Sequence, residues 1–405
     1  MPQYVSPGVY IEETGQPPHS IQGVSTSTAG FVGPAHSGPL YVPTEPLTSL
    51  IEFEQIYGGP ESMQFENASP SPNLMWHAAR AFFENGGNRL YVSRVFSPGA
   101  SSNPDGRRPI AADYAGALDP ATNSKTGLMA FEDVGEISAV AAPGATFGCK
   151  ENCADAILIL KLLITHAEQM RYRIAVLDAA DGQTTADVQA FRSNFDSSYA
   201  ALYYPWVTIE DPSSGASLNL PPSGFIAGIY ARNDQTRGPS KSPANEVINL
   251  AAGLETLLND AEQSTLNPFG INALRFFPGR GYRVWGARTV SSDPEWKYVA
   301  LRRYFAYIEH SIDNGTQWVV FEPNGENLWD KVRDTVSNFL LNEWQSGALM
   351  GKEPNEAYFV KCDRSTMTQD DIDNGRLIIE IGIAPLRPAE FVIFRIGQWT
   401  ADRKC

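Results

Sequence analysis

Helices and strands alternate in the middle of the 405-residue chain, and this order constrains the fold more than any other feature. The spacing of apolar residues predicts helices at 154–170 and 184–195, and strands at 172–178 and 200–210. Alternation of this kind is typical of an α/β unit. We therefore place the chain in the α/β class, with a mixed α+β composition.

The segments before and after this block are similar in character, which predicts one core domain built from both ends of the chain. Before the block, a helix at 73–84 is followed by a tight turn and a strand at 90–95. The elements predicted after the block are strands at 284–290, 316–321, 358–362, 376–384 and 391–396, and helices at 224–231, 296–309 and 326–345.

Loop-rich stretches at 98–127 and 211–223 border the middle block, so we expect it to be inserted into the core domain. The predicted organisation is an extended N-terminal arm (1–24), a discontinuous core domain (25–97 and 223–388), an inserted outer α/β domain (98–222) and a C-terminal arm strand (389–405).

Charge and hydropathy exclude several classes of partner. The formal net charge of −15 repels phosphate backbones, so no nucleic acid is expected. The longest apolar stretch, 156–164, is interrupted by Lys161 and is far shorter than the ~20 residues of a membrane-spanning helix, so no direct membrane insertion is expected. The N-terminus lacks the basic and apolar regions of a secretory signal, which predicts synthesis that ends in the cytoplasm.

Motifs for catalysis and ligand binding have the wrong spacing, so we expect no catalytic residue, cofactor or metal. The glycines of 279–286 do not fit a dinucleotide fingerprint, and Lys352 is followed by Glu353 where a phosphate-binding loop needs Ser or Thr. The acidic stretch 370–375 lacks the later Glu of a calcium loop and is interpreted as a turn. Cys149 and Cys153 have no second pair to complete a metal site, and we interpret the cysteines as buried or idle thiols.

One stretch, 271–310, is basic in an otherwise acidic chain. Two interpretations are open: docking between acidic and basic surfaces of repeated subunits, or pairing of the basic residues within the chain. The seven basic residues are Arg275, Arg280, Arg283, Arg288, Lys297, Arg302 and Arg303.

Both ends of the chain contain strand-forming segments. The segment 391–396 is apolar on both faces, although it lies within fifteen residues of the last residue. It is either a strand buried in its own subunit or a strand added to the sheet of a neighbour, and the Pro-rich N-terminal arm favours the second interpretation. The residues expected to form inter-subunit strands are Gly8, Val9, Tyr10, Ile11, Glu12, Phe391, Val392, Ile393, Phe394, Arg395 and Ile396.

Further segments along most of the chain carry a family resemblance. They are 5–13, 29–35, 81–87, 90–95, 198–206, 231–238, 271–272, 284–289 and 391–399. In order and spacing these segments resemble the contractile tail sheath family, which comprises the sheaths of phage tails and of phage-tail-like contractile injection systems. The stretch 98–150 contributes little to the resemblance.

The resemblance implies a structural protein without enzymatic activity. In this family, rings of six subunits stack into a helical sheath around an inner tube, and contraction of the sheath drives the tube and spike through a target envelope. The partners implied are further copies of the chain, the inner tube protein, and baseplate and terminal cap proteins. Assembly is expected in a bacterial cytoplasm, as part of a phage tail or tail-like injection particle.

The resemblance also gives roles to residues near the C-terminus. The family's arms add strands to the sheets of neighbouring subunits, and a helix of the C-terminal region touches the tube. We therefore expect Lys331 and Arg333, on the helix at 326–345, to lie near the tube; a plain solvated face is the alternative. The alternative functions are another structural tail or baseplate component and, last, an α/β enzyme, since fold alone does not carry function.

Overall fold

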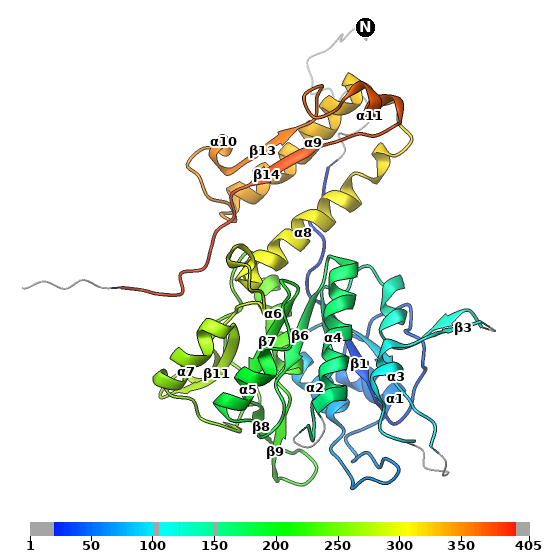
Figure 1. The fold of residues 1–405 in the computed structure, drawn as a ribbon, viewed down its shortest axis with the longest axis vertical. Coiled ribbons are helices and arrows are strands. Elements are labelled where there is room, and N and C mark those ends of the chain that lie inside the picture. The colour runs from blue at the N-terminus through cyan, green and yellow to red at the C-terminus, as the bar shows by residue number, and fades with distance from the viewer. Residues whose placement is uncertain (1–19, 100–104, 121, 150–152, 394–405) are drawn as a thin grey trace, which may run out of the picture. The chain divides into compact units, whose positions relative to one another are not determined.

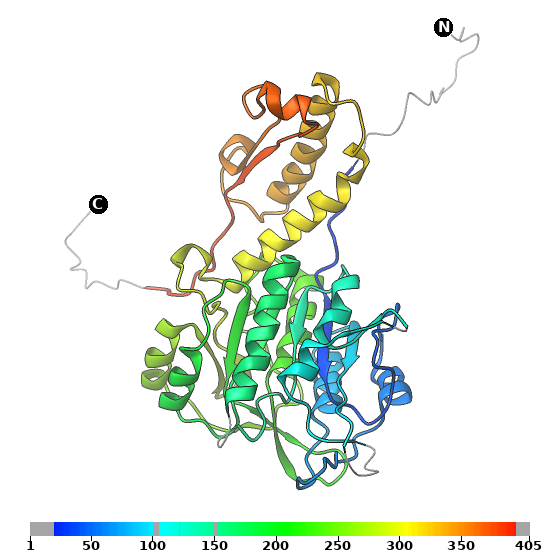
Figure 2. The same ribbon diagram turned by 45° about the vertical axis from the view of Figure 1, so that its right-hand side comes forward.

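The computed structural model describes residues 20–99, 105–120, 122–149 and 153–393. The chain divides into two compact units (Figures 1 and 2). Of the described residues, the larger is built from Gly23–His310 and 385–393, and the smaller from 20–22 and Ser311–Ala384.

A seven-stranded sheet forms the centre of the larger unit. Its order is β12-β11-β7-β6-β5-β1-β2, and all neighbouring strands are parallel except in the β11–β12 hairpin. The strands are β1 (Thr28–Gly33), β2 (Arg89–Arg94), β5 (Ala139–Ala141), β6 (Ile174–Asp178), β7 (Ala200–Tyr204), β11 (Ile271–Phe277) and β12 (Gly281–Val284).

Helices cover both faces of this sheet (Figure 1). α2 (Leu74–Glu84) and α6 (Ser223–Arg237) pack on one face, and α4 (Cys153–Met170) packs on the other. Gly228 allows the close approach of α6 to α2, because a Cβ at this position would lie 2.4 Å from the carbonyl oxygen of Phe82. The sheet is therefore the middle layer of an α/β sandwich, and its central strands are buried on both faces.

The remaining elements of the larger unit are short. They are α1 (Leu50–Tyr57), α3 (Ala111–Ala115), β3 (Leu118–Asp119), β4 (Ser124–Lys125), η1 (Gly127–Asp133), α5 (Thr185–Arg192), β8 (Val207–Glu210), β9 (Ser217–Leu220), β10 (Gly253–Leu254), α7 (Asp260–Leu266), η2 (Asn267–Phe269) and η3 (Pro294–Trp296). A longer helix, α8 (Val299–Gly315), begins in the larger unit and ends in the smaller.

The smaller unit pairs one long helix with a two-stranded antiparallel sheet. Its elements are η4 (Gln317–Val319), α9 (Glu326–Gln345), α10 (Pro354–Ala357), β13 (Tyr358–Lys361), α11 (Gln369–Asp373) and β14 (Glu380–Ile383). The apolar stripe of α9, which includes Leu328, Val332 and Val336, is buried. The long helix was predicted with these same bounds, and that prediction is confirmed.

The prediction of a separate inserted domain at 98–222 is wrong. Three strands of this block, β5, β6 and β7, lie at the centre of the large sheet between β1 and β11. Parallel strands joined by crossover connections enter one sheet from distant parts of the sequence, and apolar periodicity does not tell which sheet a strand joins. The boundaries between the two units fall instead after Gln22, after His310 and after Ala384.

Several local predictions also need correction. The segment predicted as a strand at 316–321 contains the short helix η4, and the predicted turn at 370–375 overlaps α11, which Thr368 caps. The strand predicted at 200–210 is two strands, because Pro205 has no N–H to continue the ladder of β7. Cys149 and Cys153 are joined by a disulfide and are not idle thiols.

Candidate assembly surfaces

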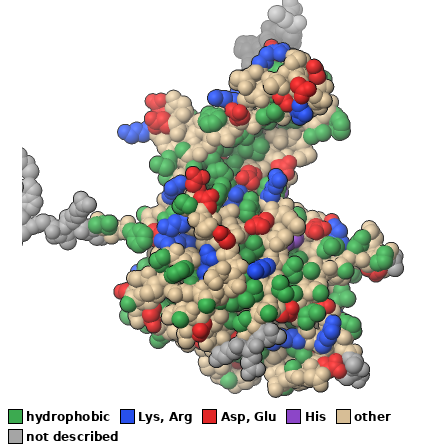
Figure 3. Space-filling view, viewed as in Figure 1, with side chains coloured by type: hydrophobic (Ala, Val, Ile, Leu, Met, Phe, Trp, Pro, Cys, Tyr) green, Lys and Arg blue, Asp and Glu red, His purple; other side chains and the backbone are tan. Residues whose placement is uncertain are grey.

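The C-terminal arm presents apolar side chains to solvent. Phe391, Val392 and Ile393 are 70%, 69% and 78% exposed and belong to no strand of their own chain. Hydrophobic side chains are visible along this outgoing segment in Figure 3, next to Lys and Arg side chains at its root. Burial of these three residues within their own subunit, the first interpretation of 391–396, is therefore wrong. The other arm residues, Phe394, Arg395 and Ile396, lie outside the described residues.

Hydrogen bonds to the larger unit hold the carboxylate of Glu390, the residue directly before this apolar segment. Arg288 donates to Glu390 from Nε (2.8 Å) and Nη2 (2.6 Å), and Asn267 Nδ2 donates at 3.1 Å. Partial burial acts to raise the pKa of Glu390, but the hydrogen bonds from Arg288 and Asn267 outweigh it, so the pKa lies below its ordinary value. Glu390 is therefore ionised at neutral pH. Sequence reasoning missed this residue, although Arg288 belongs to the basic stretch 271–310.

Other members of the basic stretch are paired within the larger unit. Arg275 lies 2.7 Å from Asp260, Arg302 lies 3.2 Å from Glu309, and Arg303 forms a fully buried pair with Asp234 at 2.5 Å. Together with the Arg288–Glu390 and Lys297–Glu390 pairs, these contacts confirm the interpretation of pairing within the chain for five of the seven basic residues.

Where the N-terminal segment enters the larger unit, a polar network anchors it at Thr26. Thr26 Oγ1 donates to Asp234 (2.5 Å), and the carbonyl of Thr26 accepts from Ser138 Oγ (2.6 Å) and Arg303 Nη2 (3.2 Å). The expected strand residues Gly8, Val9, Tyr10, Ile11 and Glu12 lie outside the described residues.

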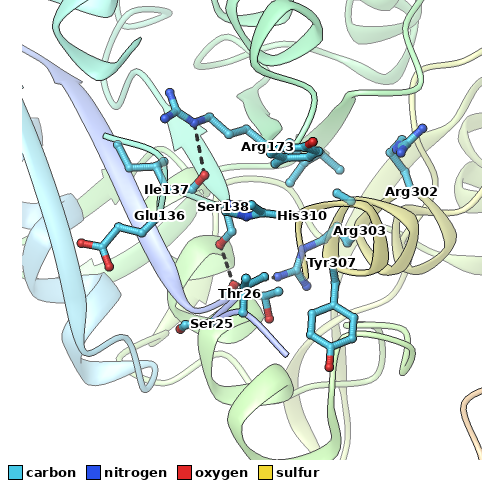
Figure 4. A pocket seen from close by; sticks show the side chains of 14 residues that line it. Ser25, Thr26, Glu136, Ile137, Ser138, Arg173, Arg302, Arg303, Tyr307 and His310 are labelled. Atoms are coloured by element: carbon cyan, nitrogen blue, oxygen red, sulfur yellow. Dashed lines mark hydrogen bonds between the residues drawn. The ribbon is translucent and has the colours of Figure 1, made fainter. Parts of the chain in front are cut away.

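A small cavity beside this network is lined by apolar, polar and charged side chains, the charged ones including Arg173 and Arg303 (Figure 4). Its volume is about 20 Å³, room for about one water molecule. Arg173 donates to the carbonyl of Ile137 (3.2 Å) and to Nε2 of His166 (2.7 Å). Burial, with Arg173 alongside, lowers the pKa of His166 to about 4, so the imidazole is neutral. Arg173 and His166 thus bind each other and the backbone. We interpret this cavity as part of the packing of the larger unit and not as a ligand site.

The smaller unit contains a sheet with open edges. β13 and β14 pair in the register Tyr358–Ile383 to Lys361–Glu380, and no third strand joins them among the residues described. A two-stranded sheet is marginal on its own, and its unpaired N–H and C=O groups can template another strand. The side chain of Phe359 is 50% exposed. This sheet was not singled out as a site in the sequence.

The exposed side of α9 carries the two basic residues predicted to face the tube. Lys331 is exposed, whereas Arg333 is partly buried and forms an ion pair with Asp330 at 2.7 Å. The helix therefore places both residues outside its buried stripe. Their proximity to a tube stays a prediction.

Two further features are absent from the residues that the structure describes. No helix among them is both long and apolar enough to cross a bilayer. No cluster of three or more His, Cys, Asp or Glu side chains in the described part of the chain is arranged to hold a metal ion.

The exposed apolar segment 391–393 and the open edges of β13 and β14 are surfaces of the kind that self-assembling proteins use. The fold and these surfaces place the chain in the class of assembly-forming structural proteins. Family models match most of the chain: the phage tail sheath protein central domain at residues 111–290 and the phage tail sheath C-terminal domain at residues 291–398. The contracted helical sheath of the anti-feeding prophage (AFP) is similar over 97% of this chain and 99% of that one, with 31% identity and a TM-score of 0.72. The chain belongs to the phage tail sheath family.

Two further relatives agree with this assignment. The contracted sheath complex of an extracellular contractile injection system, PVC, is 26% identical over the full length of both chains, with a TM-score of 0.74. A putative prophage major tail sheath protein of Pseudomonas aeruginosa (strain UCBPP-PA14) is 27% identical over 58% of this chain and 61% of its own. The chain thus spans less than two thirds of this curated relative.

Proposed function

We propose that this chain is the sheath subunit of a contractile particle. Copies polymerise as stacked hexameric rings into a helical sheath around an inner tube, and contraction of the sheath drives the tube and spike through a target envelope. The observation that carries the proposal is the exposed apolar segment from Phe391 to Ile393 on a chain that matches the AFP helical sheath over nearly its whole length. Contiguous apolar side chains exposed to water typically mark a site of interaction with a partner.

Strand exchange is the proposed linkage between subunits. The apolar arm 391–396 and the N-terminal segment 8–12 supply strands, and the open edges of β13 and β14 in neighbouring copies accept them. The small size of the β13–β14 sheet supports this role, because added strands would extend it to a size that is stable.

The proposed partners besides other copies are the inner tube, the baseplate and a terminal cap protein. One similar solved structure is the AFP baseplate, at 30% identity and a TM-score of 0.72, which supports the baseplate contact. On the tube side we propose Lys331 and Arg333 of α9. The particle is a phage tail or tail-like injection particle that is assembled in a bacterial cytoplasm, and the subunit has no enzymatic activity.

The test is the shape of the purified assembly. We expect the recombinant chain to form long tubes in negative-stain micrographs. Discrete small oligomers in both size-exclusion chromatography and micrographs would overturn the proposal and favour a baseplate component or a soluble enzyme.

A further inference from the structure

Glu390 occupies a special place in the chain: it is the last residue before the exposed apolar segment. Pro385 forms a β-bridge, and the four residues between it and Glu390, 386–389, form no helix, strand or bridge. Phe391, directly after it, is 70% exposed. The hydrogen bonds of Glu390 therefore fix the point at which the C-terminal arm leaves the larger unit.

The site that receives Glu390 is built for a carboxylate. Besides Arg288 and Asn267, the hydroxyl of Tyr298 donates at 3.3 Å, and Lys297 Nζ lies at 3.9 Å. These donors come from separate segments of the larger unit, on both sides of the hairpin β11–β12. Their convergence on one carboxylate gives a charge-assisted, bidentate contact, the strongest kind of side-chain hydrogen bonding.

Arg288 is held in place whether or not Glu390 is present. The side chain of Asn272, in β11, accepts from the backbone N–H of Arg288 (2.7 Å) and donates to its carbonyl (2.8 Å). Nη1 of Arg288 also donates to the carbonyl of Asn267 (2.6 Å). The side chain of Arg288 is only 8% exposed, so loss of Glu390 would leave a nearly buried charge without its counterion.

We propose that the Glu390–Arg288 contact is a mechanical anchor for the C-terminal arm. This inference rests on the proposed function. A neighbour that holds the strand 391–396 pulls on this arm when the rings rearrange. With the anchor, the pull is transmitted directly to β11 and the large sheet. Without it, the five residues 386–390 would be released from the larger unit and would lengthen the free arm by up to roughly 17 Å, at roughly 3.3 Å per extended residue.

The anchor makes a position-dependent prediction for the full-length chain. A Gly-Ser-Gly insertion between Arg387 and Pro388 lies before the anchor and should leave tube formation and contraction unchanged. The same insertion between Glu390 and Phe391 lies after the anchor, adds roughly 10 Å of slack to the loaded segment, and should give broken or uncontracted sheaths in negative-stain micrographs. Equal behaviour of the two insertions would overturn the anchor.

A substitution tests the contact itself. In Glu390→Gln we expect chymotryptic cleavage after Leu386, a half-exposed residue of the anchored segment, to speed up at least about tenfold, the factor that corresponds to 1.4 kcal/mol, with an unchanged circular dichroism spectrum and fewer intact sheaths. Asp370→Asn, which removes one partner of the exposed Asp370–Arg376 pair, is the matched control and should behave like the parent.

The remaining outcomes are decisive as well. Unchanged cleavage in Glu390→Gln, or faster cleavage with normal contractile sheaths, would overturn the anchor. If the Glu390→Gln chain does not fold, the pair of insertions decides, because both leave the contact intact. If the parent chain forms no tubes, the proposed function itself fails, and the anchor fails with it.

Discussion

At the scale of single residues, the larger unit contains a carboxyl group whose pKa is raised strongly by burial. Asp178 ends β6 and is 2% exposed. Its two oxygens accept from the backbone N–H and the hydroxyl of Ser223, both at 2.7 Å, at the first residue of α6. Burial raises the pKa of Asp178 to about 7, although the hydrogen bonds from Ser223 oppose this. The residue therefore titrates near neutral pH and couples proton uptake to folding.

The sign of this coupling gives the first prediction. Because the pKa of Asp178 is higher in the folded state than its ordinary 3.8, its contribution to stability is complete below about pH 4 and is lost as the pH rises through about 7. Asp178→Asn should flatten the pH dependence of the free energy of unfolding between pH 5 and 7.5, where the limiting slope is about 1.4 kcal/mol per pH unit. Urea unfolding of the unassembled subunit measures it.

Asp211→Asn is the control for this measurement. Hydrogen bonds from Ser214 and Ser213 lower the pKa of Asp211, so this group has finished titrating well below pH 5. The control should keep the slope of the parent chain. An Asp178→Asn chain that also keeps that slope would show that Asp178 stays ionised across this range.

At the scale of elements, packing between α2 and α6 depends on small residues. Gly224 and Gly228 face α2, and a Cβ on either would lie within 2.6 Å of a carbonyl oxygen, of Ala78 or of Phe82. Gly228→Ala should therefore lower the free energy of unfolding by roughly 1–3 kcal/mol, the usual cost of overpacking a core. Thermal unfolding checks it. Gly135→Ala, whose Cβ would meet nothing within 4 Å, is the control and should leave the melting temperature unchanged.

The exposed face of α9 supports a second prediction at this scale. If Lys331 and Arg333 face an acidic surface of the tube, Lys331→Glu with Arg333→Glu should lower co-purification of tube with sheath, most strongly at low salt. Arg376→Glu, on the exposed loop after α11, is the control: it reverses one positive charge of the same unit at a position outside α9 and should leave co-purification unchanged. Normal extended particles from the double variant over a wide salt range would contradict tube contact at these residues.

Some elements could be predicted well from the sequence, and the reason is local. α9 and α2 have an apolar stripe at helical spacing, and α2 has a capping residue, Asn73, so their bounds follow from nearby residues. β5 was missed because it is only three residues long, Ala139–Ala141, which is too short to show a strand pattern. Its place at the centre of the sheet depends on contacts with β1 and β6, which are distant in sequence. Glu390 was missed for the same reason: its hydrogen-bond partners are distant in sequence, and nothing next to a single acidic residue indicates them.

At the scale of the whole molecule, the proposed arms link subunits by backbone hydrogen bonds. Each is worth a net ~0.5–1.5 kcal/mol, and a strand of four to six residues adds several of them. Such bonds depend on the local register between strand and sheet edge and not on the angle between two rigid subunits. Arm contacts can therefore persist while the larger surfaces between subunits separate and form again.

The last prediction concerns the N-terminal arm. A chain that lacks residues 1–12 loses the expected strand 8–12 but keeps the network at Thr26, whose bonds to Asp234, Ser138 and Arg303 lie within the larger unit. We therefore expect its circular dichroism spectrum and melting temperature to match the parent chain. Polymerisation should fail, or the sheath should not contract as a connected lattice, because one strand of each linkage is missing. Removal of residues 1–4 alone, which spares 8–12, is the control and should leave assembly intact. Negative-stain micrographs before and after triggered contraction measure the outcome, and normal contracted tubes from the longer truncation would show that the N-terminal segment is not part of the linkage.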